Sequence, residues 1–545
     1  MSKKRKIIYI TIASAIVIIA ALAIIFMPKA APQTVTEMLS TAQKYLVEMD
    51  YERAIAEFNK VIELDPMNAD AYLGLAEAYE KSGDIDKAVE TLEKGFELTG
   101  DERLQARIAM LTSNGGVTVP NVSETEEFIT IKGEQYSTSL TNLDLSNKNL
   151  NDEDIKELNK MTNLTDLSLW GNQISDVSVL SGLTSLTQLN LYKNQISDIS
   201  ELSGLTNLTI LYLGNNQLSD ISALSGLINL AYLDLNENQI SDISVLSGLT
   251  NLTDLHLAEN QISDVSAFLK HTQLEKLSLY ENQISDISAL SGLTNLTELF
   301  LQENQISDIS ALSGLTNLTE LYLGDSQIND INALSGLTNL MSLGLSDAQI
   351  SDISVLSGLT NLTYLHLAEN QISDVSVLSK LTQLEVLYLY ENQISDISAL
   401  SRLTNLTSLD LERNKISDIS ALSGLTNLTS LDLGDNQISD ISALSGLTNL
   451  TELHLYENQI SDISALLGLA KIKYLELSEN QISNINALSG LTNLTCLWFS
   501  ENQISDISAL SGLTNIEILY LTNNPIAESD IESLKSALPN CEINY

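Results

Sequence analysis

Residues 428–449 read LTSLDLGDNQISDISALSGLTN, and this unit recurs with few changes, and without insertions, through most of a chain of 545 residues. Leu431 and Leu433 alternate with a polar residue, as in a short strand with one buried face. Asn436 follows where the chain turns inward, and its amide can pair with turn backbone groups that would otherwise be buried alone. Asp440 stands where it can cap the return segment. The unit therefore predicts a strand, a turn and a short 3-10 or extended return.

The asparagine recurs at every twenty-second position from Asn172 to Asn524, except that Ser326 and Ala348 occupy two neighbouring positions of this series. One unit cannot bury its leucines alone, so stacked units should pair their strands into a single parallel sheet. At about 4.8 Å per strand, the concave face should extend for about 80 Å along its arc. The two exceptions have two readings: decay of the repeat, or a shallow notch around the small residue Gly344.

The template L-x-x-L-x-L-x-x-N identifies these units as leucine-rich repeats, and the unit NQISDISALSGLTNL resembles the internalin type over roughly residues 140 to 525. The resemblance implies an α/β leucine-rich repeat solenoid, in which a parallel β-sheet horseshoe has a short 3-10 or extended convex side. It also implies that partner proteins are recognised on the concave face.

A second and longer repeat covers Val35 to Glu102 in two copies and resembles the tetratricopeptide repeat. The resemblance implies an all-α pair of helical hairpins before the solenoid. The positions that carry it in the two copies are Ala42, Tyr45, Ala54, Phe58 and Pro66, then Tyr72, Leu75, Ala76, Tyr79, Ala88 and Leu92.

The amino terminus predicts one transmembrane helix. Ile7–Met27 is an uncharged, mostly aliphatic run that is long enough to span a bilayer, and the basic residues of MSKKRK precede it. The basic end should stay cytoplasmic and the bulk of the chain should be extracellular, as in a single-pass protein of the cell membrane. Signal cleavage after the small-x-small triplet Ala21-Leu22-Ala23, followed by secretion, is the alternative.

The expected organisation has six parts. These are 1–30, a cytoplasmic basic tip and membrane anchor; 35–112, two tetratricopeptide repeats plus a capping helix; 113–127, a linker; 128–160, the N-terminal cap of the array; 161–525, the leucine-rich repeats; and 526–545, the C-terminal cap.

Aromatic side chains concentrate at positions between and beside the strand leucines, which should face solvent on the concave side. Exposed aromatic residues are frequent anchors for protein partners. The candidate binding residues are Trp170, Tyr192, Tyr212, Tyr232, Tyr280, Phe300, Tyr322, Tyr364, His366, Tyr388, Tyr390, Tyr456, Tyr474, Trp498 and Tyr520.

The position just before the ladder asparagine is acidic in most units, and we call this column the acidic edge. One reading is a solvated rim that keeps a long sheet soluble, and the other is a negative edge that attracts basic partners or holds calcium. Its members are Glu237, Glu259, Glu281, Glu303, Asp325, Asp347, Glu369, Glu391, Asp435, Glu457, Glu479 and Glu501.

The net charge of -44 argues against nucleic acid as a partner, because so anionic a surface repels phosphate backbones. No nucleophile and base, phosphate loop or paired catalytic carboxylates stand out from the repeats, so we expect neither an enzyme nor a cofactor or metal centre. The leading hypothesis is a membrane-anchored, outward-facing protein that binds another protein, basic in character, on its concave sheet. The alternatives are binding of a carbohydrate or cell-wall glycan and a structural scaffold of the envelope.

Overall fold

The computed structural model describes residues 51–64, 68–82, 84–99 and 127–545, with a few isolated positions beside the first three segments. The chain divides into two units, residues 1–124 and 125–545, and each unit is described by itself.

Three successive helices form the described part of the first unit. Their bounds are α3 (Tyr51–Leu64), α4 (Ala69–Lys81) and α5 (Ile85–Thr99). Small and large side chains are buried together in the packed interface: Ala54 and Phe58 of α3 are fully buried, as are Ala88 and Leu92 of α5. Alanine lets neighbouring helices approach closely, and the larger side chains fill the next layer. These four residues are among the positions that carry the resemblance to the tetratricopeptide repeat.

The predicted fold class is wrong in one component, the transmembrane helix. In the described part of the chain, no helix is long and apolar enough to cross a membrane. The longest, α5, has 15 residues, which span about 22 Å against a hydrocarbon core of about 30 Å, and it carries several charged residues. Ile7–Met27, on which the prediction rested, lies outside the described residues. The predicted localisation as a single-pass membrane protein is corrected with it.

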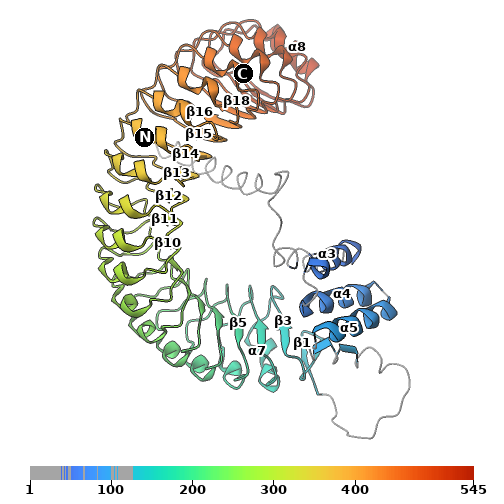
Figure 1. The fold of residues 1–545 in the computed structure, drawn as a ribbon. Coiled ribbons are helices and arrows are strands. Elements are labelled where there is room, and N and C mark those ends of the chain that lie inside the picture. Colours follow the sequence, from blue (N-terminus) through green and yellow to red (C-terminus); the bar gives the residue numbers. More distant parts are fainter. Residues whose placement is uncertain are drawn as a thin grey trace. The chain divides into compact units, whose positions relative to one another are not determined.

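The second unit is a parallel-strand solenoid that curves into an arc, as the period of the sequence predicts (Figure 1). Each strand from β3 to β20 pairs in parallel with the next strand along the chain, with leucine opposite leucine, as at Leu431 and Leu453, except that Leu519 of β20 lies opposite Ile543 of β21. The strands are β3 (Asn142–Asp144), β4 (Asp166–Ser168), β5 (Gln188–Asn190), β6 (Ile210–Tyr212), β7 (Tyr232–Asp234), β8 (Asp254–His256), β9 (Lys276–Ser278), β10 (Glu298–Phe300), β11 (Glu320–Tyr322), β12 (Ser342–Gly344), β13 (Tyr364–His366), β14 (Val386–Tyr388), β15 (Ser408–Asp410), β16 (Ser430–Asp432), β17 (Glu452–His454), β18 (Tyr474–Glu476), β19 (Cys496–Trp498), β20 (Ile518–Tyr520) and β21 (Glu542–Asn544).

The strands lie along the inner side of the arc and short 3-10 helices along its outer side (Figure 1). These helices are η1 (Leu158–Lys160), η2 (Ser178–Leu180), η3 (Ser200–Gly204), η4 (Ser222–Gly226), η5 (Ser244–Gly248), η6 (Ser266–Lys270), η7 (Ser288–Gly292), η8 (Ser310–Gly314), η9 (Asn332–Gly336), η10 (Ser354–Gly358), η11 (Ser376–Lys380), η12 (Ser398–Arg402), η13 (Ser420–Gly424), η14 (Ser442–Gly446), η15 (Ser464–Gly468), η16 (Asn486–Gly490) and η17 (Ser508–Leu510). The serine at the start of η14 donates its backbone N–H to Asp440 at 2.8 Å, so the aspartate caps the return segment as predicted.

The leucines and isoleucines of all units merge into one continuous core. An antiparallel hairpin, β1 (Phe128–Ile131) with β2 (Glu134–Ser137), and the short helix α7 (Asp152–Ile155) cover its first end. Helix α8 (Glu528–Ala537) and strand β21 close the other end, with Ile531 and Leu534 buried against the core.

The recurring asparagine joins each unit to the one before it. Asn436 Nδ2 donates to the carbonyl oxygens of Leu411 at 2.9 Å, Leu433 at 3.2 Å and Gly434 at 3.0 Å. Its Oδ1 accepts the backbone N–H of Ile416 at 2.9 Å. The side chain therefore satisfies buried polar groups of two successive turns, which is the role predicted for it.

This ladder is interrupted at Ser326 and Ala348, which are both buried and pair directly through an isolated parallel bridge. The Ser326 hydroxyl has no hydrogen-bond partner. The hydrogen bonds of the described chain also provide no acceptor for the backbone N–H of Ile306 or Ile328, the groups that ladder asparagines at these two positions would serve. The interruption therefore replaces side-chain bonds with a direct contact between two turns.

Candidate functional site

The strands present their outward-facing residues in columns along the inner side of the arc. In β13, for example, Leu365 is fully buried while Tyr364 and His366 on either side are partly exposed. The aromatic candidates all lie in these columns or two residues beyond them, and most are half-buried. Trp170 at 38% and Tyr474 at 37% are the most exposed among them.

Six of the predicted residues come together in a continuous group, which we call the aromatic track. Its members are Phe300, Tyr322, Tyr364, His366, Tyr388 and Tyr390. The first two rings stack at 5.4 Å with an angle of 15° between their planes. Ring centroids farther along are 6.2 Å apart between Tyr322 and Tyr364, and 5.8 Å apart between Tyr364 and Tyr388. These spacings lie in the range in which aromatic pairs attract each other.

Gly344 lets the aromatic track cross the interrupted units. A Cβ at this position would lie 2.5 Å from Cδ1 of Tyr322, so the Tyr322 ring occupies the space above the glycine. Its hydroxyl meets the Ser342 hydroxyl at 2.5 Å. The Tyr322 ring therefore fills the predicted notch. In this position it reaches Tyr364 across one intervening strand.

The other predicted aromatic residues are not part of the track. Tyr212 and Tyr232 form a smaller pair, 4.8 Å apart, that extends to His256 at 5.3 Å. In the described chain, no ring contact joins the remaining candidates to one another or to either group, namely Trp170, Tyr192, Tyr280, Tyr456, Tyr474, Trp498 and Tyr520.

The acidic edge occupies the tight turn after each strand. All twelve members have a left-handed backbone with φ between 45° and 57°. Glycine and asparagine adopt this conformation at lower cost than glutamate, and Gly171 and Asn215 do so in other units. Partial burial and the neighbouring charge of Glu281 raise the pKa of Glu259, and burial and Asp347 raise that of Asp325. The carboxylates therefore repel one another.

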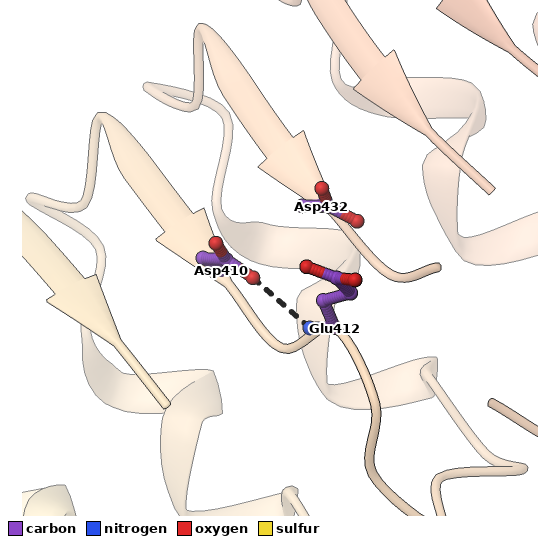
Figure 2. Close-up of side chains that lie close together, drawn as sticks. All are labelled: Asp410, Glu412 and Asp432. Atoms are coloured by element: carbon purple, nitrogen blue, oxygen red, sulfur yellow. Dashed lines mark hydrogen bonds between the residues drawn. The ribbon is translucent and has the colours of Figure 1, made fainter. Parts of the chain in front are cut away.

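Three carboxylates beside the aromatic track, which the sequence interpretation missed, form an acidic cluster: Asp410, Glu412 and Asp432 (Figure 2). One oxygen from each lies within 4.8 Å of the others. Burial and the adjacent Asp432 charge hold the pKa of Asp410 well above its usual range, and burial raises the pKa of Asp432 to about 6. The signal was present in the sequence, because Asp410 and Asp432 lie one repeat apart in the column that contains Tyr388.

Basic and phenolic groups surround the acidic cluster. Arg413 lies 2.5 Å from Glu391, 3.4 Å from Glu412 and 3.7 Å from Asp435. The Tyr456 hydroxyl also donates to Glu412. Three carboxylates fall short of the six to eight oxygen ligands that calcium takes, and Glu412 is already engaged.

Two histidines of the concave face differ in charge: His454 is positively charged and His366 is neutral. His454 Nε2 lies 2.9 Å from Glu452. Burial opposes a positive charge on His454, but the hydrogen bond to Glu452 and the charge of Asp432 outweigh it and raise its pKa to about 9. Burial lowers the pKa of His366 to about 4, so its ring is neutral within the aromatic track.

Comparison with known proteins agrees with this architecture. A family model described as leucine-rich repeats in two copies matches successive windows from residues 184–226 to 492–536, and a tetratricopeptide repeat model matches residues 46–111. An internalin from Listeria monocytogenes, InlF, is 35% identical, with 64% of this chain and 90% of that chain covered and a TM-score of 0.50. The chain therefore belongs to the leucine-rich repeat proteins. Within them it is of the internalin type, with a tetratricopeptide repeat at its amino end.

Two further structures share the fold. A leucine-rich repeat protein of Leptospira interrogans is 26% identical, with 75% of this chain and 96% of that chain covered and a TM-score of 0.54. The plant peptide hormone receptor RGFR1, in complex with RGF2, is 22% identical, with 72% and 79% covered and a TM-score of 0.55. No curated protein sequence matches the chain.

Proposed function

We propose that this protein is a non-enzymatic binding protein that recognises another protein on its concave face. The aromatic track forms the centre of the contact, and the acidic edge forms its charged rim. The track carries the proposal because half-buried aromatic rings at the centre of a surface contribute most to protein interfaces. The plant receptor, whose structure holds a peptide hormone, is an example of the same fold engaging a partner.

A glycan is the second candidate ligand, since tyrosine and tryptophan rings also stack on sugars. The stacking of Phe300 on Tyr322 covers part of the ring surface that a sugar would use. A glycan array probed with the full chain separates the two candidates, and we expect no glycan to compete with the captured protein.

The test replaces the middle of the track. We expect the Tyr364→Ala, Tyr388→Ala, Tyr390→Ala triple variant to lose its partner in affinity capture followed by identification of the retained protein. Truncating several aromatic anchors at a contact centre costs at least about 2 kcal/mol, or about thirtyfold in affinity.

A matched control removes three exposed apolar side chains outside the concave face, Ile228, Leu269 and Leu467, by replacement with alanine. This variant should retain the partner. Retention by both variants, with unchanged circular dichroism spectra, would place the contact elsewhere and contradict the proposal.

A further inference from the structure

Asp410 and Asp432 form a like-charged pair that the sheet holds in register. They are direct partners on the parallel strands β15 and β16, whose spacing is about 4.8 Å. Like charges in such a position destabilise a sheet. Burial and this repulsion together raise the pKa of Asp410, so keeping both groups ionised has a cost in the free protein.

Neither charge is needed for the local structure. Within the described chain, Asp410 accepts only the backbone N–H of Glu412, at 3.0 Å, and Asp432 only that of Gly434, at 2.8 Å. Asn190 occupies the same column in an earlier unit and makes the same bond to Tyr192, at 3.0 Å. An amide therefore performs the structural role of these aspartates without a negative charge.

The hydrogen bonds and ion pairs of the nearby cations go to other acids than these two aspartates: Arg413 is shared among Glu391, Glu412 and Asp435, and His454 pairs with Glu452. His454 is in register with Asp432, and its single charge lowers the pKa of both aspartates without cancelling both of their charges. The pair of aspartates is thus an excess of negative charge on a partly buried surface.

Tyrosines flank this charge on both sides. Tyr388 is in register with Asp410 on the neighbouring strand. On the other side, the Tyr456 ring lies over Gly434, where a Cβ would come within 2.3 Å of it, and its hydroxyl reaches Glu412. A guanidinium group suits this arrangement, because it is planar, stacks on aromatic faces and pairs with carboxylates through two parallel hydrogen bonds.

We propose that the acidic cluster and the adjoining end of the aromatic track bind a basic, extended segment of the partner protein, with an arginine side chain of that segment paired with Asp410 and Asp432 and packed against Tyr388. This inference rests on the proposed function and specifies the chemistry of the partner. The net charge of -44 adds a long-range attraction for such a segment.

The experiment uses the full chain and short fluorescent peptides in which arginine alternates with leucine and serine. Binding is measured by fluorescence anisotropy. A second peptide replaces each arginine with citrulline, which keeps the shape of the side chain and removes its charge. We expect the citrulline peptide to bind at least about tenfold more weakly.

The Asp410→Asn, Asp432→Asn double variant should also bind the arginine peptide at least about tenfold more weakly. Its midpoint of thermal unfolding should rise, because the repulsion is removed while the bonds to Glu412 and Gly434 are kept. A loss of binding in a protein of higher stability cannot be attributed to misfolding.

The matched control is Asp418→Asn, Asp440→Asn. It removes two charges from the same two units on the outer side of the arc, and Asn484 shows that asparagine caps this position in another unit, at 3.0 Å from Asn486 N. This variant should bind the arginine peptide within about twofold of the wild type.

Equal weakening in both double variants would reduce the effect to net charge and overturn the inference, as would unchanged binding in Asp410→Asn, Asp432→Asn. Stabilisation of the wild type by calcium chloride, absent from that variant, would assign the cluster to a divalent cation instead. Failure of every peptide to bind, together with partner capture that still depends on Tyr364, Tyr388 and Tyr390, would overturn this inference and leave the proposed function standing.

Discussion

At the scale of single residues, His271 is a polar side chain in an otherwise apolar core position. It is fully buried where other units have leucine, such as Leu293, and neither ring nitrogen has a hydrogen-bond partner. Its ring meets that of Phe268 edge-on at 5.7 Å. We expect His271→Leu to raise the free energy of unfolding by about 1 to 3 kcal/mol, measured by chemical denaturation, because an unpaired buried polar group is removed.

The increase in the free energy of unfolding caused by His271→Leu should become larger as the pH falls. Burial lowers the pKa of His271 in the folded protein below its usual 6.5, so below about pH 6.5 the unfolded chain takes up a proton that the folded chain does not. Stability is therefore lost as the pH falls through this range, and the leucine variant escapes the loss. The control, Phe268→Leu with His271→Leu, restores the usual unit and removes any misfit with the larger ring. No gain in either variant would contradict the reading of His271 as a strained core residue.

At the scale of elements, the bridge between Ser326 and Ala348 weakens the stack at its middle. Asparagine at both positions should restore donors to the Leu323 carbonyl and acceptors for Ile306 and Ile328. We expect Ser326→Asn, Ala348→Asn to raise the free energy of unfolding by about 1 to 3 kcal/mol in denaturant titration.

The reverse change tests the same idea in an intact part of the ladder. Asn436→Ser should destabilise the array by about 1 to 3 kcal/mol, since it leaves several buried backbone groups without partners. If asparagine at 326 and 348 destabilised the protein while Asn436→Ser did so as well, the direct bridge would be the preferred structure of these two units.

The elements could be predicted from the sequence where their determinants stand at the same position in every unit. The strand, the asparagine turn and the aspartate cap each depend on residues that recur with the repeat, so the period predicted them. Contacts across units depend on which way each side chain lies. Tyr322 crosses Gly344, and Tyr456 crosses Gly434, and neither direction can be read from a column of letters. The positions of the aromatic residues were therefore predictable, whereas their grouping into a track beside an acidic cluster was not.

At the scale of the whole molecule, the pKa values of the acidic residues are shifted in opposite directions on the two faces of the solenoid. On the outer side, backbone N–H groups of the following serines lower the pKa of capping aspartates, as at Asp418 and Asp440. On the concave side, burial and mutual repulsion raise the pKa of Asp410, Asp432 and Glu369. Because most contacts along the array join neighbouring units, these local terms add to a first approximation.

The concave carboxylates should therefore raise the midpoint of thermal unfolding of the wild type relative to the Asp410→Asn, Asp432→Asn variant as the pH falls from about 8 to about 5. In this range the folded protein takes up protons on its concave acids, whose pKa values exceed those of the unfolded chain, so acidification favours folding. His454 acts in the same direction, because its pKa of about 9 gives stability that is complete below about 6.5 and is lost as the pH rises. The outer aspartates remain ionised throughout, since their pKa values lie below 3.8.

The profile is best measured by circular dichroism in the Phe268→Leu, His271→Leu background. This background removes one of three histidines with the opposite response, and comparing variants cancels the other two, His256 and His366, whose pKa values burial also lowers. Ending the series at about pH 5 keeps the protein above its isoelectric point of 4.2. The midpoint of the wild type relative to that of Asp418→Asn, Asp440→Asn should not change over this range, because the outer carboxylates do not titrate there. If the midpoint of the wild type fell relative to that of Asp410→Asn, Asp432→Asn between about pH 8 and about pH 5, the concave carboxylates would stabilise the free array, and there would be no reason to regard their charge as held for a partner.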